Sequence, residues 1–462
     1  MTEPLSLQSI RACLEGAIPA TMATCGPDGV PNVAYISQVM YVDAQHVALS
    51  FQFFNKTRQN ILCNPWASVL VLDPRTAAYY RLQLRYRHTE DSGPTFESMR
   101  AQLAGIASHE GMAGVFELRG ADIYAVEGIE PVPGDSLPLP PPRADLLHRL
   151  RRFSEHMALC TSLDALLHET LEGLQQQLGM EHTMVLMLDD CTQHLYTVAS
   201  RGYMTSGVGS EVRMGQGVIG VCAQERTPVR ISHFTHAARY SHAIRASLDA
   251  HERADASGSP AAAAWAARGM DIPYPGLPEP HSQVAVPLIA GGRMLGVLFA
   301  ESPCDLRFDF EDEDLLVALA GQLAATVLLL QSASEQPGPA PAEPAPKQLA
   351  GTPLRVRYFE ANDSVFINDD YLIKGVAGAI FWKLLRDHSQ SGRVDFTNRE
   401  LRLDPSLRLP EVADNLEARL VLLQRRLQEN SEHIRIEKTG RGRMRLCMLR
   451  PVVLEDMRAA DA

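Results

Sequence analysis

The segment Ser50–Val71, SFQFFNKTRQNILCNPWASVLV, joins two apolar runs through basic, hydroxyl and amide side chains. A phosphate group needs a cation and several hydrogen-bond donors, preferably beside the N-terminus of a helix. Lys56 supplies the charge, Thr57 supplies a hydroxyl, and the helical pattern TRQNIL begins with free N–H groups. The segment therefore favours a phosphate site. A solvated connection between two strands is the alternative.

The sequence contains no comparable pattern for covalent catalysis or for metal binding. We see no nucleophile beside a base, no P-loop and no pair of acids at a convincing spacing, so we assign no catalytic residue. The eight cysteines occur singly and form no CxxC pair, which predicts neither a disulfide framework nor a metal site. The N-terminus lacks a basic region followed by an apolar core, and no apolar run is long enough to span a membrane. We expect a cytoplasmic protein.

Length and charge indicate several domains with different partners. The chain has 462 residues, too many for one core, and its 45% hydrophobic and 21% charged residues are typical of folded domains. Residues 352–462 carry 19 Lys and Arg against 17 Asp and Glu, whereas the net charge of the whole chain is −12. The front of the chain is therefore strongly acidic, which makes a nucleic-acid partner implausible there. Only the last part is compatible with one.

Two proline-rich segments divide the chain. Residues 132–143 contain PLPPPR and are expected to be extended, and residues 332–353 contain QPGPAPAEPAPK and are expected to be disordered. Three domains remain, at residues 1–131, 144–331 and 354–450. The predicted fold class is multidomain α+β: a split β-barrel, then a GAF-type α+β sandwich, then a winged helix, on the grounds given below.

The first domain alternates apolar and polar residues in short runs, with a helical pattern at residues 94–109, which predicts a small antiparallel barrel. The stretches ATCGPDGVPNVAYI and ALSFQFFNKTRQNILCNP resemble the pyridoxamine-5'-phosphate-oxidase-like, FMN-binding split barrels. This resemblance implies FMN as cofactor and a homodimer with the flavin between subunits. It assigns the cofactor-binding residues Ser50, Phe51, Lys56, Thr57 and Asn60, with the main chain of the first two facing the flavin ring.

The first domain also departs from the oxidases. PNVAY stands near the place of their second-strand arginine, Thr57 replaces a second base, and no residue matches their vitamin-substrate site. We therefore do not expect vitamin B6 oxidation. A degenerate barrel that only dimerises is the alternative to FMN binding.

The second domain resembles a GAF domain, a module that senses small molecules. GQGVIGVCAQERTPVRISH, SQVAVPLIAGGRMLGVLFAESP and FEDEDLLVALAGQLAATV carry the resemblance, and its ligand stays unknown. A long insertion at residues 233–281 has the length to cover the pocket. Leu146, Leu150, Phe153 and Met157 form an a/d seam in the first helix, which predicts a contact between subunits.

The third domain resembles the winged-helix output domain of response regulators. LEARLVLLQRRLQENSEHIRIEKTGRGRMRL matches the order of recognition helix and wing. The resemblance implies DNA as partner. The residues expected to contact DNA are Asn415, Arg419, Arg425, Arg426, Arg441 and Arg443. Glu411, Asp414 and Glu417 crowd the start of the helix, and a module for protein contact is the alternative.

Together these patterns predict a signal-responsive transcriptional regulator that senses a flavin or a small ligand. The main alternative is an FMN-dependent oxidoreductase with regulatory GAF and winged-helix domains. A scaffold with an empty barrel is a third interpretation. The sequence does not decide among them, since flavin chemistry depends largely on the cofactor and needs no catalytic triad.

Overall fold

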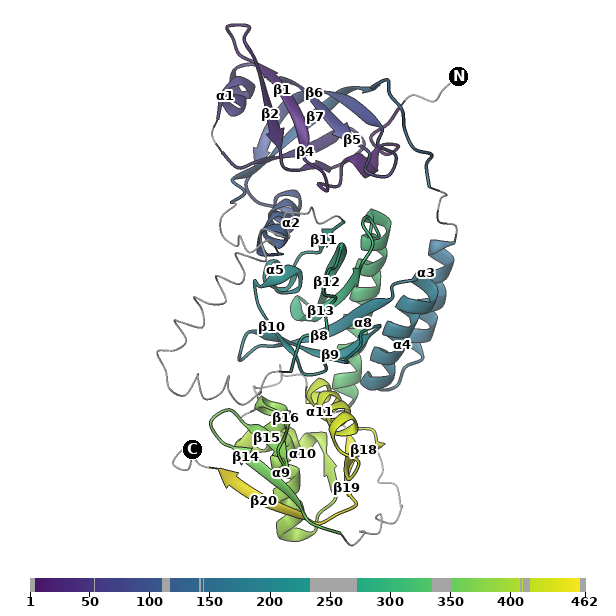
Figure 1. Ribbon diagram of the computed structural model, residues 1–462, viewed down its shortest axis with the longest axis vertical. Helices are drawn as coiled ribbons and strands as arrows, with labels where there is room; N and C mark the ends of the chain where they lie inside the picture. Colours follow the sequence, from purple (N-terminus) through teal and green to yellow (C-terminus); the bar gives the residue numbers. More distant parts are fainter. Residues whose placement is uncertain are drawn as a thin grey trace.

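The computed structural model describes residues 5–53, 55–109, 117–140, 143, 145–232, 272–334, 351–407, 409 and 416–457. Three domains are stacked along its long axis, with the N-terminal domain at one end and the C-terminal domain at the other (Figure 1). The described chain is multidomain α+β, as predicted. Most of the insertion at residues 233–281 and of the segment at residues 332–353 lies outside the described residues.

The N-terminal domain is a curled half-barrel sheet in which all neighbouring strands are antiparallel. The strand order is β2-β1-β5-β6-β7-β4-β3. The helical pattern predicted at residues 94–109 is confirmed as α2. The elements are β1 (Ala20–Cys25), β2 (Pro31–Ile36), β3 (Val39–Tyr41), β4 (His46–Phe51), α1 (Lys56–Cys63), β5 (Trp66–Leu72), β6 (Tyr79–Glu90), α2 (Pro94–His109) and β7 (Gly120–Pro131).

The middle domain is an antiparallel sheet with helices on both faces. Its strand order is β10-β9-β8-β13-β12-β11, with α4 and α8 on one face and α5 on the other. Alternation along β8 separates the two cores, since Val185 and Met187 face α4 and α8 while Met184 and Leu186 face α5. The elements are α3 (Leu146–Ala158), α4 (Leu163–Leu178), β8 (His182–Asp189), β9 (His194–Arg201), β10 (Glu211–Arg213), α5 (Gly217–Glu225), β11 (Val229–Ile231), β12 (Ser282–Ala290), β13 (Arg293–Ser302) and α8 (Phe310–Ser334).

The predicted a/d seam of α3 does not face a partner. Phe153 and Met157 are 1% and 0% exposed, and the Phe153 ring lies over Gly173 of α4, where a Cβ atom would come within 2.7 Å of it. Leu146 and Leu150 pack against the same core. The seam residues therefore pack inside their own domain, because Gly173 of α4 lets the two helices approach closely. The expectation that this seam joins subunits was wrong.

Among the described helices, α8 alone is long and apolar enough to cross a membrane by length and composition. One face of it, including Leu315, Leu319, Leu323 and Val327, is buried in the core beside β12. That burial is typical of a core helix.

The C-terminal domain combines two small sheets with three helices. A four-stranded sheet has the order β16-β15-β14-β20, and a three-stranded sheet has the order β17-β19-β18. A helix followed by a basic hairpin was predicted, and α11 is followed by the hairpin of β18 and β19. The elements are β14 (Leu354–Phe359), β15 (Ser364–Ile367), β16 (Asp370–Ile373), α9 (Gly375–Ser391), β17 (Asp395–Thr397), α10 (Asn398–Leu403), α11 (Leu416–Asn430), β18 (Ile434–Gly440), β19 (Arg443–Met448) and β20 (Val452–Met457).

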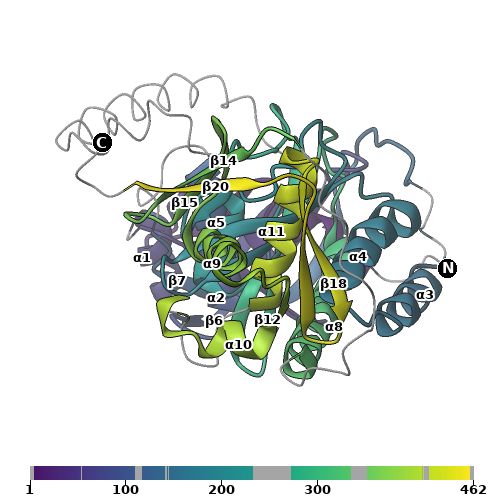
Figure 2. The same cartoon turned by 90° about the horizontal axis from the view of Figure 1, so that it is seen from below.

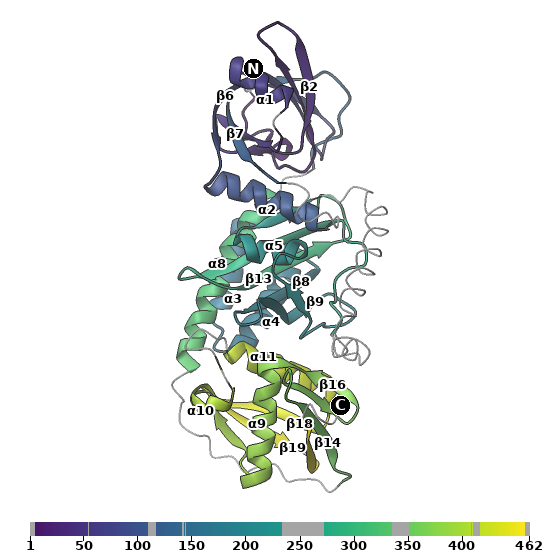
Figure 3. The ribbon, with the colours of Figure 1, turned by 90° about the vertical axis from the view of Figure 1, so that its left-hand side faces the viewer.

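Helix α2 lies between the N-terminal and middle domains and packs on both (Figure 3). Phe96, Met99 and Leu103 join the core of the half-barrel, whereas Ala101 joins the core formed by α5 and β11. Gly105 permits this closeness, since a Cβ atom there would come within 2.6 Å of Val229 Cγ1. One amphipathic helix thus serves two cores.

A buried arginine completes this upper junction. Arg230 of β11 is 7% exposed and pairs with Glu15 of the N-terminal domain and with Glu313 of α8, the latter at 2.7 Å. Gln102 of α2 donates from its Nε2 to the backbone oxygens of Arg230 and Glu15, at 3.1 and 3.2 Å. The charge is neutralised across the domain boundary in a place that excludes most water.

We expect Arg230→Ala to lower the free energy of unfolding by about 3 kcal/mol, because Glu15 and Glu313, 10% and 28% exposed at their side chains, lose their shared partner, although Glu15 keeps Arg11 at 3.5 Å. Arg100→Ala is the matched control, since Arg100 also bridges the domains, to Glu225, but is 46% exposed. An exposed pair of this kind contributes only about 0–1 kcal/mol. Urea unfolding followed by circular dichroism measures both changes. Equal losses of unfolding free energy in the two variants would contradict the conclusion that Arg230 stabilises the junction more than an exposed pair does.

Candidate functional site

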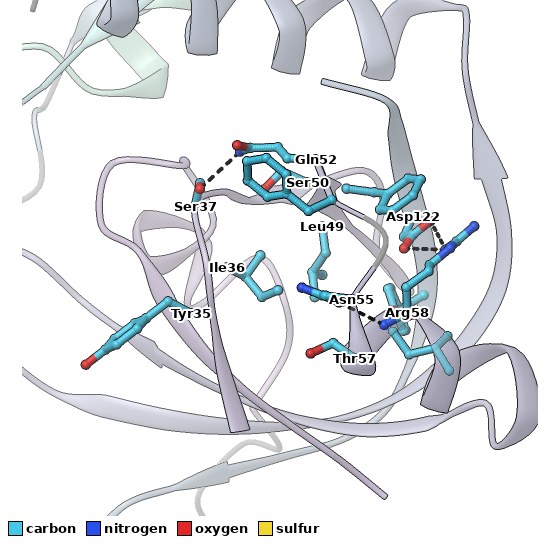
Figure 4. A pocket seen from close by; sticks show the side chains of 14 residues that line it. Tyr35, Ile36, Ser37, Leu49, Ser50, Gln52, Asn55, Thr57, Arg58 and Asp122 are labelled. Atoms are coloured by element: carbon cyan, nitrogen blue, oxygen red, sulfur yellow. Dashed lines mark hydrogen bonds and ion pairs between the residues drawn. The ribbon is translucent and has the colours of Figure 1, made fainter. Parts of the chain in front are cut away.

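A hollow opens in the half-barrel between β2, β4, β7 and the start of α1. It encloses about 560 Å3, part of it open to solvent. Asn55 and Thr57 point across it toward Ile36 and Leu49, while Tyr35 points away (Figure 4). The residues that line it are Tyr35, Ile36, Ser37, Leu49, Ser50, Phe51, Gln52, Phe53, Asn55, Thr57, Arg58, Ile61, Asp122 and Tyr124.

The start of α1 has the donors that a phosphate requires. Asn55 caps the helix by accepting from the Arg58 amide at 3.1 Å. The Thr57 hydroxyl is buried in the wall of the hollow and accepts from Asn32 Nδ2 at 2.8 Å, so its own proton can be donated. Lys56 is the first helical residue and is exposed to solvent beside the hollow. The hydroxyl and the helix terminus therefore meet at one end of the hollow, and Lys56, which does not line it, is the neighbouring cation on α1.

The other residues predicted to bind the cofactor, Ser50, Phe51 and Asn60, lie in different environments. Ser50 and Phe51 line the hollow, but the Ser50 amide donates to Gln38 and the Phe51 carbonyl accepts from Arg119. These two main-chain groups are therefore already hydrogen-bonded, and a contact between this stretch of main chain and a flavin ring stays a prediction. Asn60 does not line the hollow. Its Nδ2 donates to Thr24 Oγ1 at 3.1 Å, which ties α1 to the half-barrel.

Arg58 is a residue of this site that the sequence reasoning missed. Its Nη1 lies 2.6 Å from both oxygens of Asp122, its Nη2 donates to Thr89 Oγ1 at 2.8 Å, and its guanidinium lies 4.4 Å from the centre of the Phe51 ring. Burial raises the pKa of Asp122, although Thr89 and Arg58 act against that shift. Arg58 thus binds strands together and its charge is already paired with Asp122, whereas Lys56 is exposed and does not line the hollow.

A second cavity, of about 960 Å3 with part of it open to solvent, lies above the sheet of the middle domain. Helix α2 contributes Ser108, whose Oγ accepts from the Gly217 amide at the start of α5 at 2.7 Å. Among the described lining residues, Glu211 carries the only charge. The residues that line it are Ser108, Glu211, Val212, Gln216, Gly217, Val218, Ile219, Tyr274, Gln283 and Phe299.

A buried acid stands behind this cavity. Glu301 is 2% exposed and accepts from the Leu277 amide at 2.8 Å and from Gln283 Nε2 at 3.0 Å. Burial raises its pKa despite these bonds. Gln283, held in this way, presents a fixed amide to the cavity. Cys222 of α5 is buried, and burial raises the pKa of its thiol.

The residues predicted to contact DNA are spread over different environments. Asn415 lies outside the described residues. Arg426 donates to the backbone oxygen of Leu372 inside its own domain at 2.9 Å, and Arg441 donates to the backbone oxygen of Ala333 at the end of α8. Arg443 lies half-buried on β19.

Arg419 and Arg425 lie against the middle domain. Arg419 is 6% exposed, pairs with Asp189 at 2.9 Å and lies 4.4 Å from the centre of the Tyr196 ring. Arg425 donates to Asp164 Oδ1 at 2.8 Å. Neither arginine was expected to touch another domain, because the acids lie more than 200 residues away in the sequence.

Two family models match parts of the chain. Residues 7–126 match pyridoxamine 5'-phosphate oxidase, and residues 162–327 match the GAF domain. The chain therefore contains a domain of the pyridoxamine 5'-phosphate oxidase type and a GAF domain. No curated protein matches the chain.

Solved structures are similar to the same two parts, at low identity. A GAF domain from an Acinetobacter phosphoenolpyruvate-protein phosphotransferase is 19% identical, covers 41% of this chain and 97% of its own, and has a TM-score of 0.31. An FMN-binding protein from Syntrophomonas wolfei is 16% identical, covers 28% and 88%, and has a TM-score of 0.24. A free methionine-R-sulfoxide reductase from Neisseria meningitidis is 20% identical, covers 41% and 93%, and has a TM-score of 0.29. These likenesses are too distant to carry an argument about function.

The pair of Asp189 and Arg419 predicts a pH dependence. Burial alone would raise the pKa of Asp189, but Arg419 and two backbone amides outweigh it and lower that pKa. A carboxyl group of this kind stabilises the fold above its unfolded pKa of about 3.9, and the contribution is lost as the pH falls through the folded value. The loss of stability caused by Asp189→Asn should stay constant from about pH 8 to pH 5 and shrink only below about pH 4. Urea unfolding across this range measures it, and a loss that already shrinks between pH 7 and pH 5 is the contrary result.

Proposed function

We propose that this chain is a cytoplasmic, signal-responsive transcriptional regulator. In this proposal the N-terminal domain is a split barrel that binds FMN, the GAF domain binds a small molecule, and the C-terminal domain is a winged helix that binds DNA. One observation carries the proposal. The N-terminal domain and the GAF domain each contain a cavity, the first packs on the second, and the GAF domain packs on the C-terminal domain, which carries the basic helix α11. Helix α2 joins the first two domains, and α11 lies at the boundary between the second and third domains (Figures 1 and 3).

The hollow of the half-barrel fits FMN. Lys56, the Thr57 hydroxyl and the first N–H groups of α1 would hold the phosphate, and Ile36, Leu49 and the Phe51 side chain would contact the ring system. FMN, when bound, supplies flavin redox chemistry. The protein would contribute the anion site and a partly buried apolar wall. Redox state is a plausible input for a regulator built on this domain.

The GAF cavity favours a neutral or cationic ligand. Its described lining has one acid, Glu211, with a second acid, Glu301, behind Gln283, and includes no Lys, Arg or His. Glu211 is already paired with Lys374 at 3.1 Å, so a carboxylate or phosphate ligand would meet an acid whose counter-charge is engaged, which is unfavourable at low dielectric. Tyr274 and Phe299 offer aromatic surface that suits a flat or cationic group.

The order of elements in the C-terminal domain supports a winged helix. Three helices, α9, α10 and α11, precede the hairpin of β18 and β19, and Arg441 stands at the turn of the hairpin. Lys and Arg balance the acids in this domain, unlike in the rest of the chain. The alternative, which DNA-binding measurements must distinguish from a winged helix that binds DNA, is a domain that contacts only protein.

Exposed apolar side chains beside the hollow support a homodimer. On the edge strand β2, Val33 and Tyr35 are 65% and 84% exposed. Phe53 and Trp66 add 62% and 49% exposed aromatic side chains on the same domain. A second copy of the chain would cover such a patch, and a dimer would present two winged helices to a two-fold DNA site.

We expect Lys56→Ala to weaken FMN binding about tenfold, since it removes a charge-assisted contact. Thr57→Val should weaken binding as well, through loss of a hydroxyl donor. Gln59→Ala is the matched control, because Gln59 lies exposed on the same helix, as Lys56 does, but carries no charge. Fluorescence titration with FMN measures all three. Equal affinity in the wild type and Lys56→Ala would refute the phosphate assignment.

DNA binding predicts a steep salt dependence, because phosphate contacts release counterions. Arg441→Ala and Arg443→Ala should weaken binding to all sequences and reduce the slope of log affinity against log salt by about one per lost contact. Selection from genomic fragments, followed by affinity measurements at several salt concentrations, tests this. If no fragment is enriched by the wild type or by a variant with α11 released from the GAF domain, DNA binding is wrong.

A further inference from the structure

Helix α11 has no open face in this structure. Leu416, Leu420, Leu423 and Leu427 pack into the core of the C-terminal domain, as their spacing predicts. The opposite side is covered as well, since Leu422 is 4% exposed. A Cβ atom on Gly209, between β9 and β10, would lie 3.7 Å from Leu422 Cδ1. A helix that reads DNA must present one side to the groove, so this side would have to be uncovered first.

Besides the contact of Leu422, the cover includes acids of the GAF domain. Asp164 in the first turn of α4 accepts from Nε and Nη2 of Arg425, at 3.0 and 2.8 Å, and Asp189 at the end of β8 pairs with Arg419. Arg425 Nη1 also donates to the Val198 carbonyl of β9 at 2.8 Å. A third pair joins Glu211 to Lys374, just before α9, at 3.1 Å. Figure 2, seen from the C-terminal domain, places α11 over the middle of the stack.

A carboxylate and a phosphate offer an arginine the same kind of acceptor. We infer that Asp164 and Asp189 occupy the positions of duplex phosphates on α11, so that binding to the GAF domain and binding to DNA exclude each other. The structure is then the closed, DNA-free state of a switch. This inference rests on the proposed DNA binding and adds its mode of regulation.

The energetics suit a reversible contact. Asp164 is 60% exposed and Arg425 20% exposed at their side chains, so this pair contributes little against solvent. Asp189 and Arg419 are 13% and 7% exposed and form the stronger part of the contact. When only a fraction of molecules is open, the apparent dissociation constant for DNA exceeds the intrinsic one by the inverse of that fraction. Weakening the GAF side alone should therefore tighten DNA binding without touching any group that contacts DNA.

The test uses the full chain carrying Asp164→Asn and Asp189→Asn together. Asparagine keeps an oxygen at Asp189 for the Cys191 amide that it caps, and it removes the charge. Asp190→Asn is the matched control, because Asp190 is the exposed neighbour and pairs with no base among the described residues. Asp164→Lys is a second opening variant at an exposed position, in case the double variant is poorly folded. The readouts are affinity for a selected DNA duplex at fixed salt and amide hydrogen exchange over residues 416–430.

We expect both opening variants to bind DNA about tenfold or more tightly than the wild type, and to exchange faster in α11 before DNA is added. Asp190→Asn should match the wild type in both readouts. Wild type and opening variants that bind DNA equally well would refute the switch and leave the proposed function standing. If no variant binds DNA at any salt concentration, the proposed function fails and the inference fails with it.

Discussion

Buried arginines that find their carboxylates in a neighbouring domain hold this chain together. A guanidinium group that leaves water loses several kcal/mol of hydration and needs acceptors in the right geometry to offset that loss. Arg230 obtains them from Glu15 and Glu313, and Arg419 obtains one from Asp189. Each partner set crosses a domain boundary, so each domain contributes to a neighbour's electrostatics. Separation of the domains would leave charges behind in poorly hydrated places.

Helix α2, at the junction of the N-terminal and middle domains, also lies beside the walls of both cavities. Its apolar face packs beside Ala121 and Ile123 of β7, which flank Asp122 in the hollow of the half-barrel. Its other end places Ser108 at the start of α5, on the wall of the GAF cavity. One rigid element therefore touches the walls of both cavities. The two cavities are therefore joined by packed side chains of α2 as well as by the proline-rich linker.

The lower junction, between the middle and C-terminal domains, connects the GAF cavity to α11 in a similar way. Glu211 lines that cavity and pairs with Lys374 of the C-terminal domain. A ligand that draws on the Glu211 carboxylate competes with Lys374 for the same oxygens. Glu211 also lies on β10, next to the loop whose Gly209 meets Leu422. The cavity and the contact that covers α11 thus share one strand.

The sequence by itself determined two of the domains, the half-barrel and the GAF domain, and many of their elements. Hydrophobic periodicity, turn residues and family motifs are local, and they were sufficient for the half-barrel, for the GAF sheet and for the helix at Lys56 and Thr57. The apolar face of α11, at Leu416, Leu420, Leu423 and Leu427, was likewise readable from its spacing.

Only the tertiary structure decided which side chains meet. Arg58 finds Asp122, 64 residues away on β7, and this pairing removes Arg58 from the free cations of the hollow. The seam of α3 turns inward because Gly173 leaves room for Phe153. Arg419 and Arg425, which look like DNA contacts on an isolated helix, meet acids of another domain. A helical pattern shows which residues share a face of the helix and what their chemistry is. What packs against that face depends on contacts between residues far apart in the sequence, and these contacts produce no periodic pattern.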